Sequence, residues 1–298
     1  MTQVITAIVV NYNAGPLLRR CAEALLACPL VAKVVVVDNA SSDGSLSALA
    51  GLPRLLTIEN ADNRGFAAAC NQGIDRVDTE YLLFMNPDCT FAPGALQPII
   101  DTLRADTSVG MAGGMLVNPD GTEQVGGRRA IPTPWRSFVR AFGLYRLNGW
   151  WPTIFFDFNL HKQPLPDVPI EVEAISGACM LVKRAAVDSV GRWDERYFLH
   201  CEDLDWCMRF RQQGWKIMFV PNAKIEHDAG TCSRRRPIFV EWHKHKGMVR
   251  FYRKFFMHQY PGVLMWLVGA GVWLRFAAVA CRHAARGLWR RLRVRRSF

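Results

Sequence analysis

Three carboxylates stand close together in the segment 198–209, which reads FLHCEDLDWCMR. Glu202, Asp203 and Asp205 fall in the first turn of a predicted helix, where unpaired N–H groups and the helix dipole favour negative charge. Acidic residues in such a turn can simply stabilise the helix. Aromatic side chains flank these three, however, and carboxylates enclosed by rings tend to be poised for proton transfer. The segment is therefore either a stable helix start or a site of acid–base chemistry.

A second set of polar residues follows short apolar runs typical of buried strands. These runs alternate with helical patterns, which predicts a doubly wound α/β fold with a mostly parallel sheet. Ligands of such sheets bind beyond the carboxyl ends of the strands. The runs 4–11, 33–38 and 80–86 each end in polar residues, and another polar cluster precedes a helix at 65–77. The residues expected at this edge are Asn11, Tyr12, Asn13, Asp38, Arg64, Gly65, Asn86 and Asp88.

The pattern changes after residue 128. Residues 128–170 are rich in Pro, Arg and aromatic residues, which predicts a long irregular or helical excursion. It either contacts an amphipathic substrate or a membrane surface, or packs on its own domain. Order resumes with a predicted strand at 172–182, in which Gly177 can let a ligand approach the backbone. A later strand at 223–227 ends at His227.

Composition limits the class of protein. With 298 residues, half of them hydrophobic, the chain can bury a sizeable core and is not a disordered protein. The start, MTQVITAIVV, has no basic leader, so we expect a first strand there and a cytoplasmic location for most of the chain. Nine cysteines without a CxxC pair predict buried, reduced thiols and neither a disulfide framework nor a zinc site.

The positive charge gathers at the C-terminus. Residues 236–298 contain 14 Lys and Arg but one acidic residue, Glu241, whereas the rest of the chain is close to neutral. This contrast predicts a globular domain at 1–235, with a nucleotide-binding half at 1–120 and an acceptor-binding half at 121–235. Residues 236–298 would form a basic, Trp-rich helical segment that needs an anionic partner.

The apolar stretch 260–281 decides which partner is expected. Arg275 interrupts it after 13 residues counted from Gly262, while a helix that spans a membrane needs about 20 apolar residues. We therefore predict an interfacial or re-entrant helix, anchored by Trp266, Trp273 and Trp289, with the Arg-rich tail on anionic lipid. The alternative is a helix packed on the domain or at a dimer interface. A nucleic acid partner is not predicted, because a Trp-rich apolar helix suits lipid better.

Seven stretches of the sequence, in this order and spacing, resemble the family 2 glycosyltransferases of GT-A fold. Within that family they most resemble the rhamnosyltransferase-like members that extend bacterial cell-surface glycans, and the resemblance covers roughly residues 3–255. The stretches are VVNYNAGPLLRRCAEAL, VVVVDNASSDGS, NRGFAAACNQGI, YLLFMNPDCTF, ISGACMLVKR, GRWDERYFLHCEDLDWCMRFRQQGW and VPNAKIEH.

The resemblance implies a divalent cation, Mg²⁺ or Mn²⁺, on the diphosphate of a nucleotide sugar. Asp88 would anchor it as the last residue of a D-x-D type motif, whose first position is Asn86 here, so the metal could rest on one carboxylate. His227 would complete the metal or diphosphate site. Arg64 and Gly65 precede a helix start that could receive the diphosphate. From the residues alone, the Asn-Pro-Asp sequence would form a turn and Arg64 would be a surface residue. A lone His such as His227 would have a structural role.

The resemblance also implies that Asp38 contacts the nucleoside. Its carboxylate could accept the N3–H of uracil or thymine, which predicts a dTDP- or UDP-sugar. Tyr12 could stack on the base, and the backbone around Asn11 and Asn13 could frame it. From the residues alone, Asp38 is an ordinary turn residue, and the two roles are compatible.

Glu202 and Asp203 align with the family's Glu-Asp pair, which implies that Asp203 is the catalytic base. Glu202 would orient the acceptor or tune Asp203, and Asp205 would be structural. A single displacement inverts the anomeric centre. The prediction is a metal-dependent inverting transferase, with dTDP-rhamnose as the best donor, that acts on a lipid-linked glycan in cell-surface polysaccharide or lipopolysaccharide synthesis. It would be peripheral on the inner face of the plasma membrane. The alternatives are a hexose or furanose donor, or a nucleotide-sugar-binding or scaffold protein without turnover.

Overall fold

The computed structural model describes residues 3–228 and 236–295, with the side chains of the last helix described up to residue 286. The side chain of Trp289, predicted as a membrane anchor, lies outside these residues. In the first part of the chain, strands and helices alternate: β1 (Ile5–Asn11), α1 (Pro16–Ala27), β2 (Val31–Asp38), η1 (Ser47–Leu49), β3 (Leu55–Glu59), α2 (Phe66–Ile74), β4 (Tyr81–Met85), β5 (Cys89–Phe91), α3 (Gln97–Ala105) and β6 (Val109–Val117).

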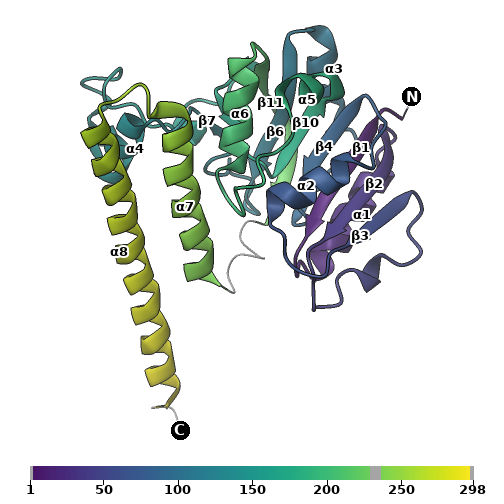
Figure 1. Cartoon of the computed structure of the whole chain (residues 1–298). Helices are drawn as coiled ribbons and strands as arrows, with labels where there is room; N and C mark the ends of the chain where they lie inside the picture. The colour runs from purple at the N-terminus through teal and green to yellow at the C-terminus, as the bar shows by residue number, and fades with distance from the viewer. Residues whose placement is uncertain (1–2, 229–235, 296–298) are drawn as a thin grey trace.

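The second part contains shorter strands and the longest helices (Figure 1). Its elements are β7 (Arg128–Arg129), α4 (Pro134–Ala141), η2 (Leu144–Leu147), η3 (Leu160–Lys162), β8 (Ile170–Glu171), β9 (Ala174–Ile175), β10 (Cys179–Lys183), α5 (Arg184–Val190), α6 (Glu202–Gln212), β11 (Lys216–His227), α7 (Pro237–Phe256) and α8 (Gly262–Arg295).

A mostly parallel sheet organises the domain, as predicted. Its strand order is β3-β2-β1-β4-β10-β6-β11-β5, with β8 also on β11. The strands β3, β2, β1 and β4 run parallel, as do β6 and β11, whereas β10 is antiparallel to both of its neighbours. Asn11 lies opposite Asp38 in the β1–β2 register. The predicted polar residues at strand ends therefore do share one edge.

Helices cover both faces of the sheet, which explains the unbroken apolar runs. Ile8 and Val10 of β1 pack with α2, α5 and α6 on one face, while Ala7 and Val9 pack with α1 and α3 on the other. Because successive side chains of a strand point to opposite faces, a strand covered on both sides must be apolar at every position. The Val-rich sequence of β2 follows the same rule.

The single strand predicted at 172–182 is wrong. The chain forms β9 and β10 with a turn between them, and β9 pairs with β7 in a separate two-stranded sheet. The backbone N–H of Gly177, in that turn, donates to Asp203 and not to a neighbouring strand. An apolar run cannot reveal such a break, because both pieces are buried.

The excursion at 128–170 is irregular and helical, as predicted, and holds α4, η2 and η3. The eight cysteines that the structure describes are free thiols, and seven of them are buried. This agrees with the expectation of reduced, buried cysteines.

The two C-terminal helices lie side by side (Figure 1). Phe251, Tyr252 and Phe256 of α7 are buried in the same core as α6, so α7 is packed on the domain. Trp273 of α8 lies against Trp242 of α7, with ring centroids 4.9 Å apart, whereas Trp266 is 71% exposed. By length and composition the stretch Gly262–Arg286 could also cross a membrane, so its predicted interfacial or re-entrant placement stays a prediction. The division at residue 235 stays a prediction.

Candidate active site

The carboxyl ends of β1 and β2 hold an ordered polar loop around Asp38. The Asn11 amide donates to Asp38 Oδ1 at 2.6 Å and to Ser45 Oγ at 2.8 Å, and the backbone N–H of Ser41 donates to Asp38 Oδ2 at 2.9 Å. Asp38 thus fixes the turn, as the residues alone suggested. Each oxygen keeps a further lone pair, so the carboxylate can still accept a hydrogen bond from a ligand.

Asn13 and Tyr12 lie in the same loop. Asn13 has a φ of 55°, and its Oδ1 accepts from the backbone N–H of Ser42 at 2.8 Å. Asn adopts left-handed backbone more readily than most residues, and here its side chain ties the loop after β1 to the loop after β2. Tyr12 is half-buried. Their predicted role beside a base stays a prediction, but the loop that would carry it is well ordered by hydrogen bonds.

The start of α2 offers fewer free donors than the sequence suggested. The N–H of Gly65 donates to Asn63 Oδ1, and the N–H of Phe66 donates to the carbonyl oxygen of Phe198, both at 2.9 Å. Gly65 has a φ of 85°, and a Cβ there would lie 2.6 Å from the Phe198 oxygen, so only glycine fits. Arg64 remains exposed, with a carboxylate oxygen of Asp62 at 3.9 Å, and is available to an anion.

Asp88 and His227 meet at the ends of β4 and β11. His227 Nε2 lies 3.3 Å from Asp88 Oδ1 and 3.5 Å from the Asn86 amide nitrogen. On the other side of the ring, Nδ1 lies 2.6 Å from Gln124 Oε1. The Gln124 amide nitrogen donates to the His227 carbonyl, which fixes its orientation. Nδ1 is therefore the donor, and a neutral ring directs its Nε2 lone pair toward Asp88.

This pair fits a divalent cation. A carboxylate oxygen and an imidazole lone pair that face each other repel, and a cation or a proton between them removes the repulsion. Cys89 lies beside them, but its thiol is 3.5 Å from the Ala178 carbonyl, and burial raises its pKa well above the usual range. Asp88 and His227 line a pocket of about 240 Å³ together with Arg20 and Thr90. Sequence reasoning missed Gln124, which carries no motif of its own.

Asp203 is held by a cation that sequence reasoning also missed. Arg129 Nη2 donates to Asp203 Oδ2 at 2.5 Å, and the Gly177 N–H donates to the same oxygen at 3.2 Å. Among the described residues Oδ1 accepts only from the N–H of Leu204, at 2.8 Å, so it is the oxygen with room for another donor. Burial raises the pKa of Asp203, but the charge and hydrogen bond of Arg129 outweigh it and leave the pKa below its usual value.

Glu202 has the opposite environment. It is 7% exposed, and its Oε2 has no hydrogen-bond partner among the described residues. Burial, followed by the negative charge of Asp203, raises the pKa of Glu202 to about 8. The pKa values of the two neighbouring carboxyl groups thus move in opposite directions, so that Asp203 is ionised and Glu202 is protonated at neutral pH. Such a split separates a base from a hydrogen-bond donor.

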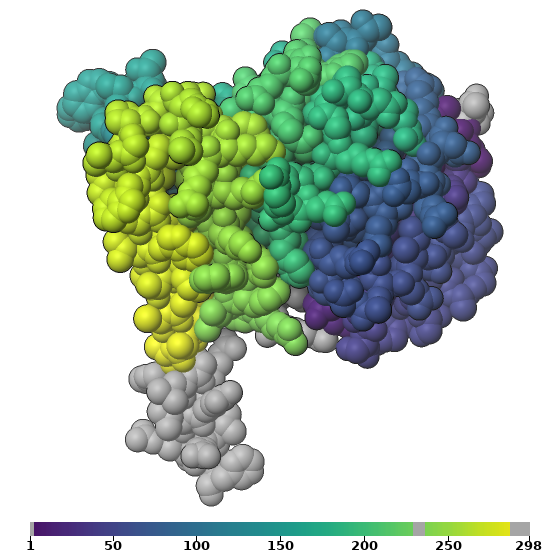
Figure 2. Space-filling model, viewed as in Figure 1, coloured from purple at the N-terminus to yellow at the C-terminus, as the bar shows by residue number. Residues whose placement is uncertain are grey.

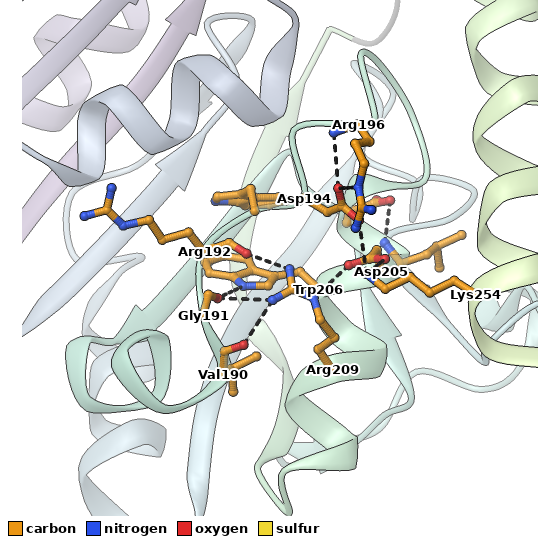
Figure 3. A network of polar contacts seen from close by, with 12 residues as sticks. Val190, Gly191, Arg192, Asp194, Arg196, Asp205, Trp206, Arg209 and Lys254 are labelled. Atoms are coloured by element: carbon orange, nitrogen blue, oxygen red, sulfur yellow. Dashed lines mark hydrogen bonds and ion pairs between the residues drawn. The ribbon is translucent and has the colours of Figure 1, made fainter.

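Asp205 has the structural role predicted for it. It is fully buried and accepts from Arg209 at 2.7 Å and from Lys254 at 2.6 Å. Lys254 also reaches Asp194, at 3.1 Å (Figure 3), and Arg250 donates to the same carboxylate at 2.8 Å. Burial opposes the ionisation of Asp194, but its hydrogen bonds to cationic side chains lower its pKa strongly. This network ties α6 to α7 and to the loop before α6.

One turn connects the metal pair to the carboxylates. The Asn86 N–H donates to the Ala178 carbonyl at 3.0 Å, and the adjacent Gly177 contacts Asp203. On the other side, the Phe198 carbonyl binds the start of α2. His200 and Cys201, before α6, both have a positive φ. Strained backbone of this kind is frequent at functional sites. The predicted residues therefore form one continuous region at the carboxyl edge.

Known proteins are similar to this chain over most of its length. The sequence profile described as Glycosyl transferase family 2 matches residues 6–191. The N-acetylglucosaminyl-diphospho-decaprenol L-rhamnosyltransferase of Mycobacterium tuberculosis is 28% identical over 250 residues, 80% of each chain. The low-salt glycan biosynthesis hexosyltransferase Agl10 of Haloferax volcanii is 24% identical over 73% of this chain and 64% of its own length.

Solved structures share the fold. The mannosyltransferase PcManGT from Pyrobaculum calidifontis, in complex with GDP-Man and Mn²⁺, superposes with a TM-score of 0.56 at 18% identity over 95% of this chain and 80% of its own. GalNAc-T7, with UDP, GalNAc and Mn²⁺, gives a TM-score of 0.56 at 15% identity over 76% of this chain and 44% of its own. Since the family profile spans more than half of its residues, the protein belongs to glycosyl transferase family 2 and has the GT-A type fold predicted from its sequence.

Proposed function

We propose that the protein transfers a sugar, with inversion, from a nucleotide sugar to a hydroxyl of a lipid-linked glycan, in the synthesis of a cell-surface polysaccharide. The best candidate donor is dTDP-rhamnose, and a hexose or furanose donor is the alternative. The name of the Mycobacterium tuberculosis relative, a rhamnosyltransferase whose acceptor carries a diphospho-decaprenol, supports both the sugar and the lipid.

The arrangement of Asp203 carries the proposal. It is an ionised carboxylate whose Oδ2 is fixed by Arg129 and Gly177, while Oδ1 keeps a free lone pair. In the transfer, the acceptor oxygen forms a bond to the anomeric carbon and its proton passes to Asp203 Oδ1. The bond between that carbon and the diphosphate oxygen breaks, and its electron pair leaves with the nucleoside diphosphate. A positioned base of this kind contributes roughly 10²–10⁴-fold to the rate.

The other residues bind and orient the substrates. Asp88 and His227 would hold Mg²⁺ or Mn²⁺, which when bound neutralises the charge of the leaving diphosphate. Asp38 and its loop would bind the nucleoside, and Arg64 would contact the diphosphate. Glu202, protonated at neutral pH, can donate a hydrogen bond to a sugar oxygen without adding a second negative charge beside Asp203.

A donor screen tests the function. Nucleotide sugars, dTDP-rhamnose first, are incubated with Mg²⁺ or Mn²⁺ and a lipid-diphosphate-linked acceptor, and the product is detected by mass spectrometry. We expect transfer with wild type and nucleotide binding without transfer in Asp203→Asn. Binding of the donor by wild type with no transfer to any acceptor would instead indicate a nucleotide-sugar-binding protein without turnover.

The same proposal places the protein on the inner face of the plasma membrane through α8. The helix exposes Val263, Trp266 and Leu267, and only 6% of its most apolar window is buried. Its Arg residues suit anionic lipid. Replacing Trp266 and Leu267 by Ser in the full chain should lower its retention on anionic vesicles. Equal retention of wild type and variant would contradict the role of α8.

A further inference from the structure

The segment 134–154, which we name the flap, exposes its apolar side chains. Trp150 is 79% exposed and Phe142 is 69% exposed. Trp135, Phe138 and Phe142 lie at helical spacing along one side of the flap and contact one another in sequence, with centroid distances of 5.6 and 4.6 Å. An ordinary surface helix buries such a stripe. The further apolar side chains of the flap that are at least 40% exposed are Leu147, Trp151 and Ile154.

The flap is firmly attached to the domain, so this exposure is not that of a loose loop. Arg136 makes two hydrogen bonds to Glu173, at 2.7 and 3.2 Å, and Arg140 makes two to Asp157, at 2.8 and 2.7 Å. Val139, beside the stripe on α4, is fully buried. The chain therefore uses polar contacts and one apolar contact to hold α4 with its aromatic stripe facing outward.

The flap lies at the same end of the molecule as the beginning of α8. Ser137 of α4 accepts a hydrogen bond from the hydroxyl of Tyr252, near the end of α7, at 2.6 Å. The short connection 257–261 then leads to α8, which packs back along α7. Figure 2 shows the teal flap and the yellow start of α8 protruding at this end. Met257, between the two, is 56% exposed.

We propose that the flap is a second membrane-docking element, which inserts its aromatic side chains into the interface of an anionic bilayer beside the first turns of α8. The proposal rests on the membrane association proposed for α8, but it concerns different residues. Trp and Phe are favoured where acyl chains meet head groups. Two attachment points separated by more than 100 residues of chain would fix the orientation of the domain on the membrane, which one helix cannot do.

The charge near the flap favours an anionic bilayer, and not a second copy of the chain, as its partner. Between residues 134 and 165 the sequence has four Lys and Arg and one acidic residue, Asp157. Arg136 and Arg140 are paired with Glu173 and Asp157, so the surplus is carried by Arg146 and Lys162, which form no ion pair with the described residues. Anionic head groups complement this surplus. In a twofold dimer the flap would meet its own copy, so that positive charge would face positive charge.

Vesicle flotation of the full chain tests the proposal. The variant F142S/W150S removes the two most exposed large apolar side chains of the flap, and V125S/V168S is the matched control, because Val125 and Val168 are 57% and 63% exposed and lie outside the flap. Vesicles are phosphatidylcholine with phosphatidylglycerol, and a thermal shift with dTDP checks that each variant is folded. We expect F142S/W150S to lower the partition coefficient by at least about tenfold, since two large apolar surfaces no longer leave water, and the control to leave it unchanged.

Three results would overturn the proposal. One is equal partition of F142S/W150S and the control while W266S/L267S loses binding, which would leave α8 as the membrane contact without the flap. Another is a halved mass of F142S/W150S in vesicle-free solution with unchanged partition, which would make the flap a self-contact. The third is an equal loss for F142S/W150S and V125S/V168S. None of these measurements requires turnover, so a failure of the proposed enzymatic function would be seen separately.

Discussion

Asp203 and Asp205 stand two positions apart in the first turn of α6, and cations hold them from different parts of the chain. Arg129, from the excursion after β6, binds Asp203, whereas Arg209 of α6 itself and Lys254 of α7 bind Asp205. Asp203 keeps one oxygen with room for a donor, while both oxygens of Asp205 are bound by charged groups. The same residue type in the same turn thus serves chemistry in the proposed function in one case and the attachment of α7 in the other.

Replacing Asp203 by Asn should give the largest effect on activity. The amide cannot take the acceptor proton, so we expect the transfer rate to fall roughly 10²–10⁴-fold, while nucleotide binding stays close to that of wild type. Single-turnover kinetics with a saturating donor measure this. Undiminished turnover would mean that Asp203 is not the base.

Replacing Asp205 by Asn should have the opposite effect, a loss of stability without a large loss of activity. It leaves Lys254 and Arg209 without their buried partner, which we expect to lower the free energy of unfolding by about 3 kcal/mol. Denaturant unfolding of both variants, side by side, measures the difference. The folded fraction of Asp205→Asn should keep most of its transfer rate. A stable but inactive Asp205→Asn variant would break the contrast between the two carboxylates.

Replacing Gln124 by Ala tests the second part of the site in the same way. His227 would lose the acceptor that fixes its tautomer, and losses of this kind weaken metal binding about 10–100-fold. Isothermal titration calorimetry with Mn²⁺, in the presence of dTDP, gives the affinity for the metal. The neighbouring exposed residue Val125 offers a control, because Val125→Ser should bind Mn²⁺ as wild type does.

Replacing Glu202 by Gln should have the smallest effect, and its sign depends on pH. The pKa of Glu202 is raised to about 8 in the folded protein, against 4.5 for an ordinary Glu. Between these values the folded state binds more protons than the unfolded state, so the stability of wild type falls as pH rises through this window. Glu202→Gln cannot ionise at this position, so it lacks this loss of stability. We expect its melting temperature to exceed that of wild type at pH 8 but not at pH 4, and thermal unfolding at both pH values measures it.

The activity of Glu202→Gln offers a second test of the roles of Glu202 and Asp203. A Gln resembles a protonated Glu, so transfer at pH 7 should be largely preserved. If wild type loses activity above about pH 8 because Glu202 ionises, the variant should lack that decline. A strong loss at pH 7 would mean that the ionised form of Glu202 is the active one.

The sequence predicted the sheet because its strands are covered on both faces. Only apolar residues fit such strands, so Val-rich runs such as that of β2 stand out, and the polar residues after them mark the carboxyl edge. Asn11, Asp38 and Asp88 were placed at that edge correctly. The break at Gly177 was missed, since its cause is a hydrogen bond to a residue 26 positions away.

Local sequence also singled out the carboxylates of α6, because three of them share one predicted helix turn, whereas His227 and the division of roles between Asp203 and Asp205 came from the family resemblance. It could not show what holds them. Arg129 is 74 positions from Asp203, Lys254 is 49 positions from Asp205, and Gln124 is 103 positions from His227. Only the tertiary structure decided which carboxylate is left with a free lone pair and which is locked in an ion pair. Charge interactions act over a few ångströms of space, and the sequence does not record that distance.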